Sequence, residues 1–286
     1  MSVDIIAIVV RTLGFVAMLQ AVGIIIFIAF FGSQTRGLSD ELRVTASGMA
    51  LAGLLFVGIH QLLEAARMTG SLAGIMDVSL QRRALLSESG LANGFRMAGM
   101  LAIIVGGARL GLRSLLPGLI GGLLVAISFA TTGHTSINPL RGLLAPLLVL
   151  HLWVVAFWFG ALWPLYRATG LESTVAAVIV HRFSKLATWM VPCIAAAGFG
   201  MAAAIVPTWQ ALWTPYGLLL SCKLLGFSVL MGLAALNKLR LAPALAQGSP
   251  TAARALRYSL TMEFMLITTV LAVTATMTAM YSPTVE

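Results

Sequence analysis

The sequence has little charge and few cysteines for its length, and these shortages restrict its class. Only 9% of the 286 residues are charged, whereas a soluble domain carries about 25%. A mean hydropathy of +0.99 and a hydrophobic content of 59% are instead typical of a protein that crosses a membrane many times. Both cysteines, Cys193 and Cys222, fall inside apolar runs, where free thiols behave as small hydrophobic groups.

The motifs of common soluble enzymes are also missing. We find no Walker loop, no GxGxxG opening a helix after a strand, no HExxH and no CxxC pair. The net charge of +9 does not form a nucleic-acid-binding patch, because the basic residues lie in short gaps between apolar runs. We therefore predict a membrane protein that is not an enzyme, that contacts the lipid bilayer and that does not bind nucleic acid.

Long apolar runs dominate what is present. A membrane-spanning helix needs about 20 mostly apolar residues. Eight such runs lie at 5–31, 44–66, 90–110, 114–133, 143–166, 181–206, 215–238 and 258–280. We predict an all-α polytopic membrane helix bundle of eight transmembrane helices, in two four-helix halves at 1–142 and 143–286. The segment 238–257, with its prolines and Gly248, is expected to be an ordinary connector.

The basic residues orient the expected helices. The odd-numbered loops hold eleven of them: Arg36, Arg43, Arg109, Arg113, Arg167, Arg182, Lys185, Lys238, Arg240, Arg254 and Arg257. The even-numbered loops hold only Arg67, Arg82, Arg83 and Arg141. Because basic loops stay in the cytoplasm, we predict that both termini face the periplasmic side.

Three histidines are expected at one depth in the outer half of the bundle. His60, His134 and His151 lie in or at the end of different apolar runs, and His151 opens the stretch HLWVVAFWFGALWPLYR. Ionisable groups inside spanning helices face the interior and are functional candidates. Neutral imidazoles suit copper, zinc and iron, so the three form a candidate metal site in the N-terminal half. The alternative is that each is a hydrogen-bonded helix contact.

Other outer residues bear on this candidate site. Glu64 follows His60 by one helical turn on the same face. The thioethers of Met97 and Met100 would favour Cu(I), although methionines also fill gaps in apolar bundles. Arg11 and Arg96 would repel a lone copper ion; they are the partners that the propionates of a haem b would need, unless they snorkel to the headgroups.

The inner half has a second polar set, for which we expect His181, Lys223, Asn237 and Glu263. Glu263 is nearest in depth to Asn237, Lys185 and His181. Two interpretations stay open for it, a polar clamp between helices and a place in an ion path.

The order and spacing of several segments resemble one family. HLWVVAFWFGALWPL, HRFSKLA, TPYGLLLSCKLLG, LAALNKLRLAPAL and RYSLTMEF follow one another as in the copper-resistance protein D (CopD) family of inner-membrane proteins, with the GHT around His134 before them. The resemblance covers roughly the second half, which makes 143–286 a CopD-like half. Positions that match the family are His134, His151, Trp158, Gly160, Phe183, Ser184, Tyr216, Gly217, Lys223, Asn237 and Glu263.

The resemblance implies a multi-pass protein of the bacterial inner membrane that moves copper, alongside a separate periplasmic copper carrier of the CopC kind. Our first hypothesis is copper transport or handling, with uptake from the periplasm through His60, His134 and His151 and release near Glu263 and His181. The alternative is a haem b electron-transfer protein that uses a pair of these histidines. A third hypothesis is an assembly subunit that holds neither ligand.

Overall fold

The computed structural model describes residues 2–107, 114–133, 138–206 and 208–281, and this part of the chain is helical, without strands. The long helices are α1 (Ser2–Phe31), α2 (Ser39–Thr69), α4 (Glu88–Gly107), α5 (Leu115–Ala130), α7 (Arg141–Ala168), α8 (Ser173–Ile205), α9 (Pro215–Leu236) and α11 (Pro250–Met280). The short helices are η1 (Arg36–Leu38), η2 (Leu72–Met76), α3 (Val78–Leu85), η4 (Trp209–Trp213), η5 (Asn237–Leu241) and α10 (Ala242–Ala246). The all-α fold class is confirmed.

Seven helices in the described residues are long and apolar enough to cross a membrane. The other apolar helix, α5, has 16 residues. At 1.5 Å per residue it measures about 24 Å, less than the roughly 30 Å of a hydrocarbon core. The chain is therefore a multi-pass membrane helix bundle, and the count of eight spans stays a prediction.

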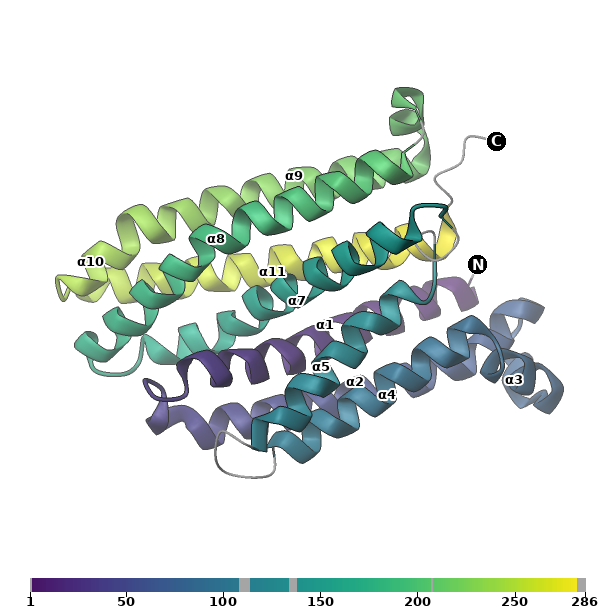
Figure 1. The fold of residues 1–286 in the computed structure, drawn as a ribbon, viewed down its shortest axis with the longest axis horizontal. Helices are drawn as coiled ribbons and strands as arrows, with labels where there is room; N and C mark the ends of the chain where they lie inside the picture. The colour runs from purple at the N-terminus through teal and green to yellow at the C-terminus, as the bar shows by residue number, and fades with distance from the viewer. Residues whose placement is uncertain (1, 108–113, 134–137, 207, 282–286) are drawn as a thin grey trace.

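The start of α1 and the end of α11, which lead to the two termini, lie at the same end of the bundle (Figure 1). The long helices run alternately in opposite directions, and η2, α3 and η4 lie at the end where the termini lie. The turns after α1, α7 and α10 lie at the opposite end, where Arg36, Arg167 and Arg254 are exposed.

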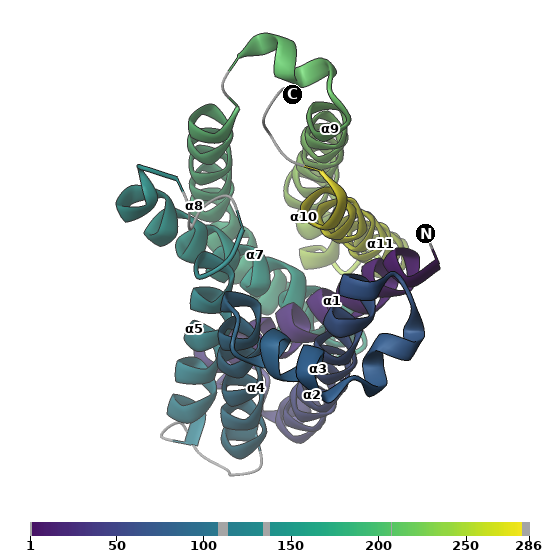
Figure 2. The same cartoon turned by 90° about the vertical axis from the view of Figure 1, so that its right-hand side faces the viewer.

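Helix α1 is the centre of the packing (Figure 2). In its most apolar 18-residue window 78% of the residues are buried, against 11% for the span that starts with α9. It packs against α2, α5, α7 and α11. A helix that is apolar all round is buried in this way.

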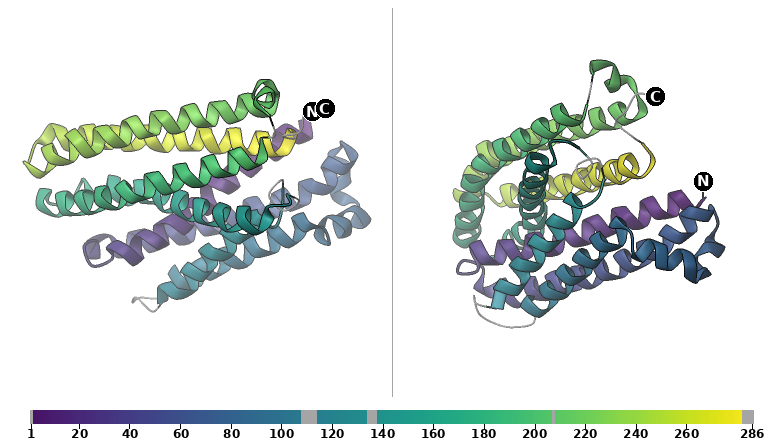
Figure 3. Two further views of the ribbon diagram at one scale, coloured as in Figure 1. Left: turned by 45° about the horizontal axis from the view of Figure 1, so that its top comes forward. Right: turned by 45° about the vertical axis from the view of Figure 1, so that its right-hand side comes forward.

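The helices of the two halves lie side by side along α1 and α7. Figure 3 shows α1, α2 and α4 along one side of the bundle and α8, α9 and α11 along the other. Helix α8 packs on α7 and α10, and α9 packs on α11. The outward faces of α8 and α9 carry large apolar side chains, such as Trp189 and Leu225, and these faces suit contact with lipid.

The expectation of an ordinary connector at 238–257 was wrong. Helix α9 continues through the π-helical turn η5 into α10, and α11 already begins at Pro250. The break is confined to a short turn in which Gly248 has a φ of 77°, a conformation that favours glycine. Proline at the first turn of α11 needs no backbone N–H partner, so it is compatible with a helix start.

Two glycines bring α1 and α7 into backbone contact. A Cβ atom built on Gly23 would lie 2.7 Å from the Cα atom of Gly160, and it would also meet the carbonyl of Ala156. Small residues allow membrane helices to approach in this way. The close contact fixes how the two halves cross.

We expect Gly160→Ala to lower the stability of the bundle by about 1–3 kcal/mol, because the added methyl overpacks the crossing. Thermal unfolding of the detergent-purified protein measures this change. The matched control is Gly200→Ala in α8, where a Cβ atom meets nothing within 4 Å. Equal unfolding temperatures for the two variants would contradict the proposed tight crossing.

Candidate functional site

A line of charged side chains follows one face of α2 towards the end where the termini lie. The Nδ1 atom of His60 is 3.6 Å from Oε1 of Glu64, and Nη1 of Arg67 is 3.7 Å from the same oxygen. Arg67 also pairs with Asp4 of α1 at 3.3 Å and donates to the carbonyl of Ala279. The expected alignment of His60 and Glu64 on one face is confirmed.

Arg96 of α4 is the centre of a buried hydrogen-bond network. Its Nε donates to the hydroxyl of Ser128 at 3.1 Å, and its Nη1 donates to Oδ1 of Asn93 at 2.7 Å. Asn93 in turn donates to Oε1 of Gln61 at 2.7 Å. The guanidinium carbon also lies 4.7 Å from the ring centroid of Phe129. Because Arg96 is only 6% exposed, the snorkelling interpretation was wrong for this residue.

Arg11 of α1 joins this network at a small cavity. The cavity is lined by Arg11, His60, Asn93 and Arg96 together with apolar side chains of α1 and α2. It has room for about one water molecule. The Nε atom of Arg11 is buried and has no hydrogen-bond partner among the described residues. The structure thus brings together four residues that the sequence places on three separate helices.

The two candidate thioethers lie in the contact between α4 and α2. Met100 is fully buried, and its Sδ lies 3.0 Å from the position of a Cβ atom on Gly53. Met97 packs in the same way near Gly58. Both positions fit the gap-filling interpretation, in which flexible thioether side chains complete an apolar interface.

His151 faces a different set of helices. Its ring packs against Gly198 of α8, and the positive charge of Lys223 on α9 acts on it. Its Nδ1 atom is buried and has no hydrogen-bond partner within the described ranges. Lys223 lies 14 residues, about 21 Å, before Asn237 along the helix, so it does not join the contacts around Glu263.

The described residues do not bring the three histidines into one centre. His60 contacts residues of α2 and lies near α1 and α4, whereas His151 contacts α8. His134 lies outside the described residues. In the described part of the chain, no group of three or more His, Cys, Asp or Glu side chains is placed to hold a metal ion. The shared site of His60, His134 and His151 stays a prediction.

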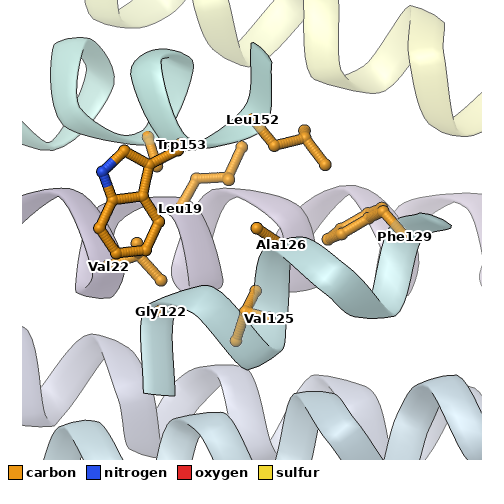
Figure 4. Close-up of a pocket in the computed structure, with 9 residues that line it drawn as sticks. Leu19, Val22, Gly122, Val125, Ala126, Phe129, Leu152 and Trp153 are labelled. Carbon is orange, nitrogen blue, oxygen red and sulfur yellow. The ribbon is translucent and has the colours of Figure 1, made fainter. Parts of the chain in front are cut away.

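A second cavity, between α1, α5 and α7, is almost entirely apolar (Figure 4). It is lined by Leu19, Val22, Gly122, Val125, Ala126, Phe129, Leu152, Trp153 and Ala156. Figure 4 shows Trp153 of α7 above Val22 of α1, on the side of the cavity opposite to Phe129. Without polar groups that converge on it, this cavity offers no ligand for an ion.

Glu263 of α11 is the centre of the inner polar set. It is 2% exposed and accepts two hydrogen bonds, from Nε1 of Trp158 at 3.1 Å and from Nδ2 of Asn237 at 2.6 Å. The carboxylate of Glu263 therefore joins α7, η5 and α11. This geometry agrees with the clamp interpretation, and the neighbouring Lys238 extends it by donating to Thr188 of α8 at 2.8 Å. His181 is exposed and takes no part in the clamp.

Comparison with known proteins places this chain in a family. Residues 1–139 match the copper resistance protein D-like N-terminal domain, and residues 177–277 match copper resistance protein D. Copper resistance protein D of Pseudomonas syringae pv. tomato is 30% identical over 254 residues, which cover 81% of this chain and 82% of that protein. The chain belongs to the copper resistance protein D family. No solved structure matches it.

The copper resistance protein D relationship extends through the first half of the chain, beyond the segments that carry the resemblance in the sequence. Two partners in the polar networks, Gln61 and Ser128, were nevertheless not predicted. Trp158 was selected as a family position, but its hydrogen bond to Glu263 was not predicted. Gln61 and Ser128 are polar residues inside apolar runs, and that signal was sufficient to select them. Nothing in the spacing of Trp158 and Glu263 indicates that they meet, because they are 105 residues apart.

The residues around His60 do not fit a haem b. A haem b held by a pair of these histidines would need both rings to face one slot large enough for the macrocycle. His60 and His151 contact different helices, and the cavity beside His60 holds about one water molecule. We therefore derive no electron-transfer role from these histidines.

The clamp at Glu263 predicts a measurable coupling with Trp158. In a double-mutant cycle, Trp158→Phe and Glu263→Gln should show an interaction energy of about 0.5–3 kcal/mol, because the two side chains share a buried hydrogen bond. Thermal unfolding of the purified single and double variants measures it. The control cycle pairs Glu263→Gln with Trp189→Phe, since Trp189 is 78% exposed. Additive effects at Trp158 would show that the hydrogen bond does not contribute to stability.

Proposed function

We propose that this protein moves copper ions across the bacterial inner membrane, taking them up from the periplasm. The observation that carries the proposal is the family relationship, since a relative named copper resistance protein D is 30% identical over most of the chain. The bundle supplies what an ion carrier needs, namely apolar spans with imidazoles inside them.

The proposed orientation follows from the charges at the two ends of the bundle. The end opposite to the termini carries most of the basic loop residues, so we place it in the cytoplasm. With α5 counted as a short span, eight helices cross the membrane and both termini are periplasmic. A separate carrier of the CopC kind would then deliver copper to the side where α3 and η4 lie.

Two imidazoles lie at similar distances from the ends of their helices on that side. His60 is nine residues before the end of α2 and His151 is ten residues after the start of α7, which places both about 14–15 Å from their helix ends. Neutral imidazole is a suitable copper ligand. Because the two rings contact different helices, we propose that they act as two separate positions for copper, with Glu64 adding a negative charge beside His60.

Copper accumulation in cells tests this proposal. Cells that express the protein should contain more copper than cells with an empty vector, as measured by mass spectrometry of washed cells. His60→Ala and His151→Ala should each reduce the excess at least several-fold, because an imidazole ligand is lost.

The matched control is Gln247→Ala, since Gln247 is exposed in the turn between α10 and α11 and has no role in the proposed path. Membrane abundance of each variant is measured in parallel, so that loss of protein is distinguished from loss of function. A lower copper content in expressing cells would contradict uptake, and full accumulation in both histidine variants would contradict their role as ligands.

A further inference from the structure

The small cavity beside His60 is surrounded by more positively charged side chains than negatively charged ones. Arg67 has Glu64 and Asp4 within 4.0 Å. Arg11 and Arg96 form no ion pair of that length among the described residues, although both lie within spanning helices and line the cavity. The charge of Glu64 acts on both of them, but Glu64 also pairs with Arg67, so three guanidinium groups share the two carboxylates of Glu64 and Asp4. An excess of positive charge in a low-dielectric region is costly.

The hydrogen bonds around the cavity also lack an acceptor. Arg96 donates to Asn93, and Asn93 donates to Gln61, which fixes the orientation of both amides. The chain of donors then ends at Nε2 of Gln61, which is buried and has no partner in the described structure. Nε of Arg11 is also buried and has no hydrogen-bond partner among the described residues. Of these two groups, only Nε of Arg11 belongs to a residue that lines the cavity, and it lacks an oxygen acceptor in the described part of the chain.

We propose that this cavity binds a small monovalent anion of about chloride size between Arg11 and Arg96. Such an anion supplies both the negative charge and the acceptor that the cluster lacks. The cavity volume, near that of one water molecule, selects a halide over sulfate or a larger carboxylate. The Phe15 and Phe129 rings beside the two guanidinium groups hold them in place from the apolar side.

This inference goes beyond the proposed transport of copper, because its test uses no copper and changes no histidine. A bound anion would also lower the repulsion that Arg11 and Arg96 exert on a cation at His60. Failure of anion binding would leave the copper experiment unaffected.

Thermal unfolding of the full chain in detergent tests the anion site. Chloride replaces gluconate at constant ionic strength, so that a general salt effect stays constant. The midpoint should rise saturably by about 5 °C in chloride. Bromide should act in the same way, and sulfate should not because it exceeds the cavity.

The variants Arg11→Gln and Arg96→Gln should lose most of this rise, whereas the control Arg141→Gln, at an exposed arginine, should keep it. In gluconate, Arg11→Gln should shift the midpoint less than it does in chloride, since it breaks no hydrogen bond with the described residues and the attraction of Arg11 to Glu64 is partly offset by repulsion from Arg67. A merely structural arginine would instead lower the midpoint equally in both salts. An absent rise, or an equal rise in all variants, would overturn the proposal.

Arg96 also holds Ser128 and Asn93, so its glutamine variant is the one at risk of misfolding. For this reason a second measurement uses Arg11→Gln alone. Broadening of the chloride-35 magnetic resonance line by the purified protein should be saturable and should disappear in this variant. Broadening that persists unchanged would overturn the assignment to Arg11.

Discussion

Charged groups inside a hydrocarbon layer need partners, and this requirement organises the polar residues of the bundle. Lipid chains are as apolar as leucine, so the hydrophobic effect does little to hold spanning helices together. Polar contacts take on part of that role. Glu263 joins three helices through Trp158 and Asn237, and Arg67 joins α2 to the ends of α1 and α11. Each of these charges has a partner at a helix contact.

Among the residues that the structure describes, the polar side chains form separate systems. The His60 system lies among α1, α2 and α4, whereas His151 lies towards α8 and α9. Helix α1 packs against both α2 and α7, and its contact with α7 passes through the glycine pair. Helix α1 therefore lies between the helices that surround His60 and the helix that carries His151.

Much of the fold could be predicted from the sequence, because lipid restricts the backbone to helices and apolar length defines a span. The alignment of His60 with Glu64 follows from helical periodicity, and the meeting of Asn237 with Glu263 follows from depth. Rotation of the helices could not be predicted in the same way. A helix that is apolar all round, such as α7, has no polar face to show which side turns inward. The direction of His151 was therefore undetermined.

The π-helical turn η5 contains two adjacent residues that form hydrogen bonds with two different helices. Asn237 bonds to α11 and Lys238 bonds to α8, and α10 then packs on α8. A π turn contains one more residue than the α-helical turn that it replaces. Deleting one residue within it would restore a continuous α-helix and rotate everything beyond by about 100°. The phase of α10 relative to α9 is thus set by a single inserted residue, and the packing of α10 on α8 depends on that phase.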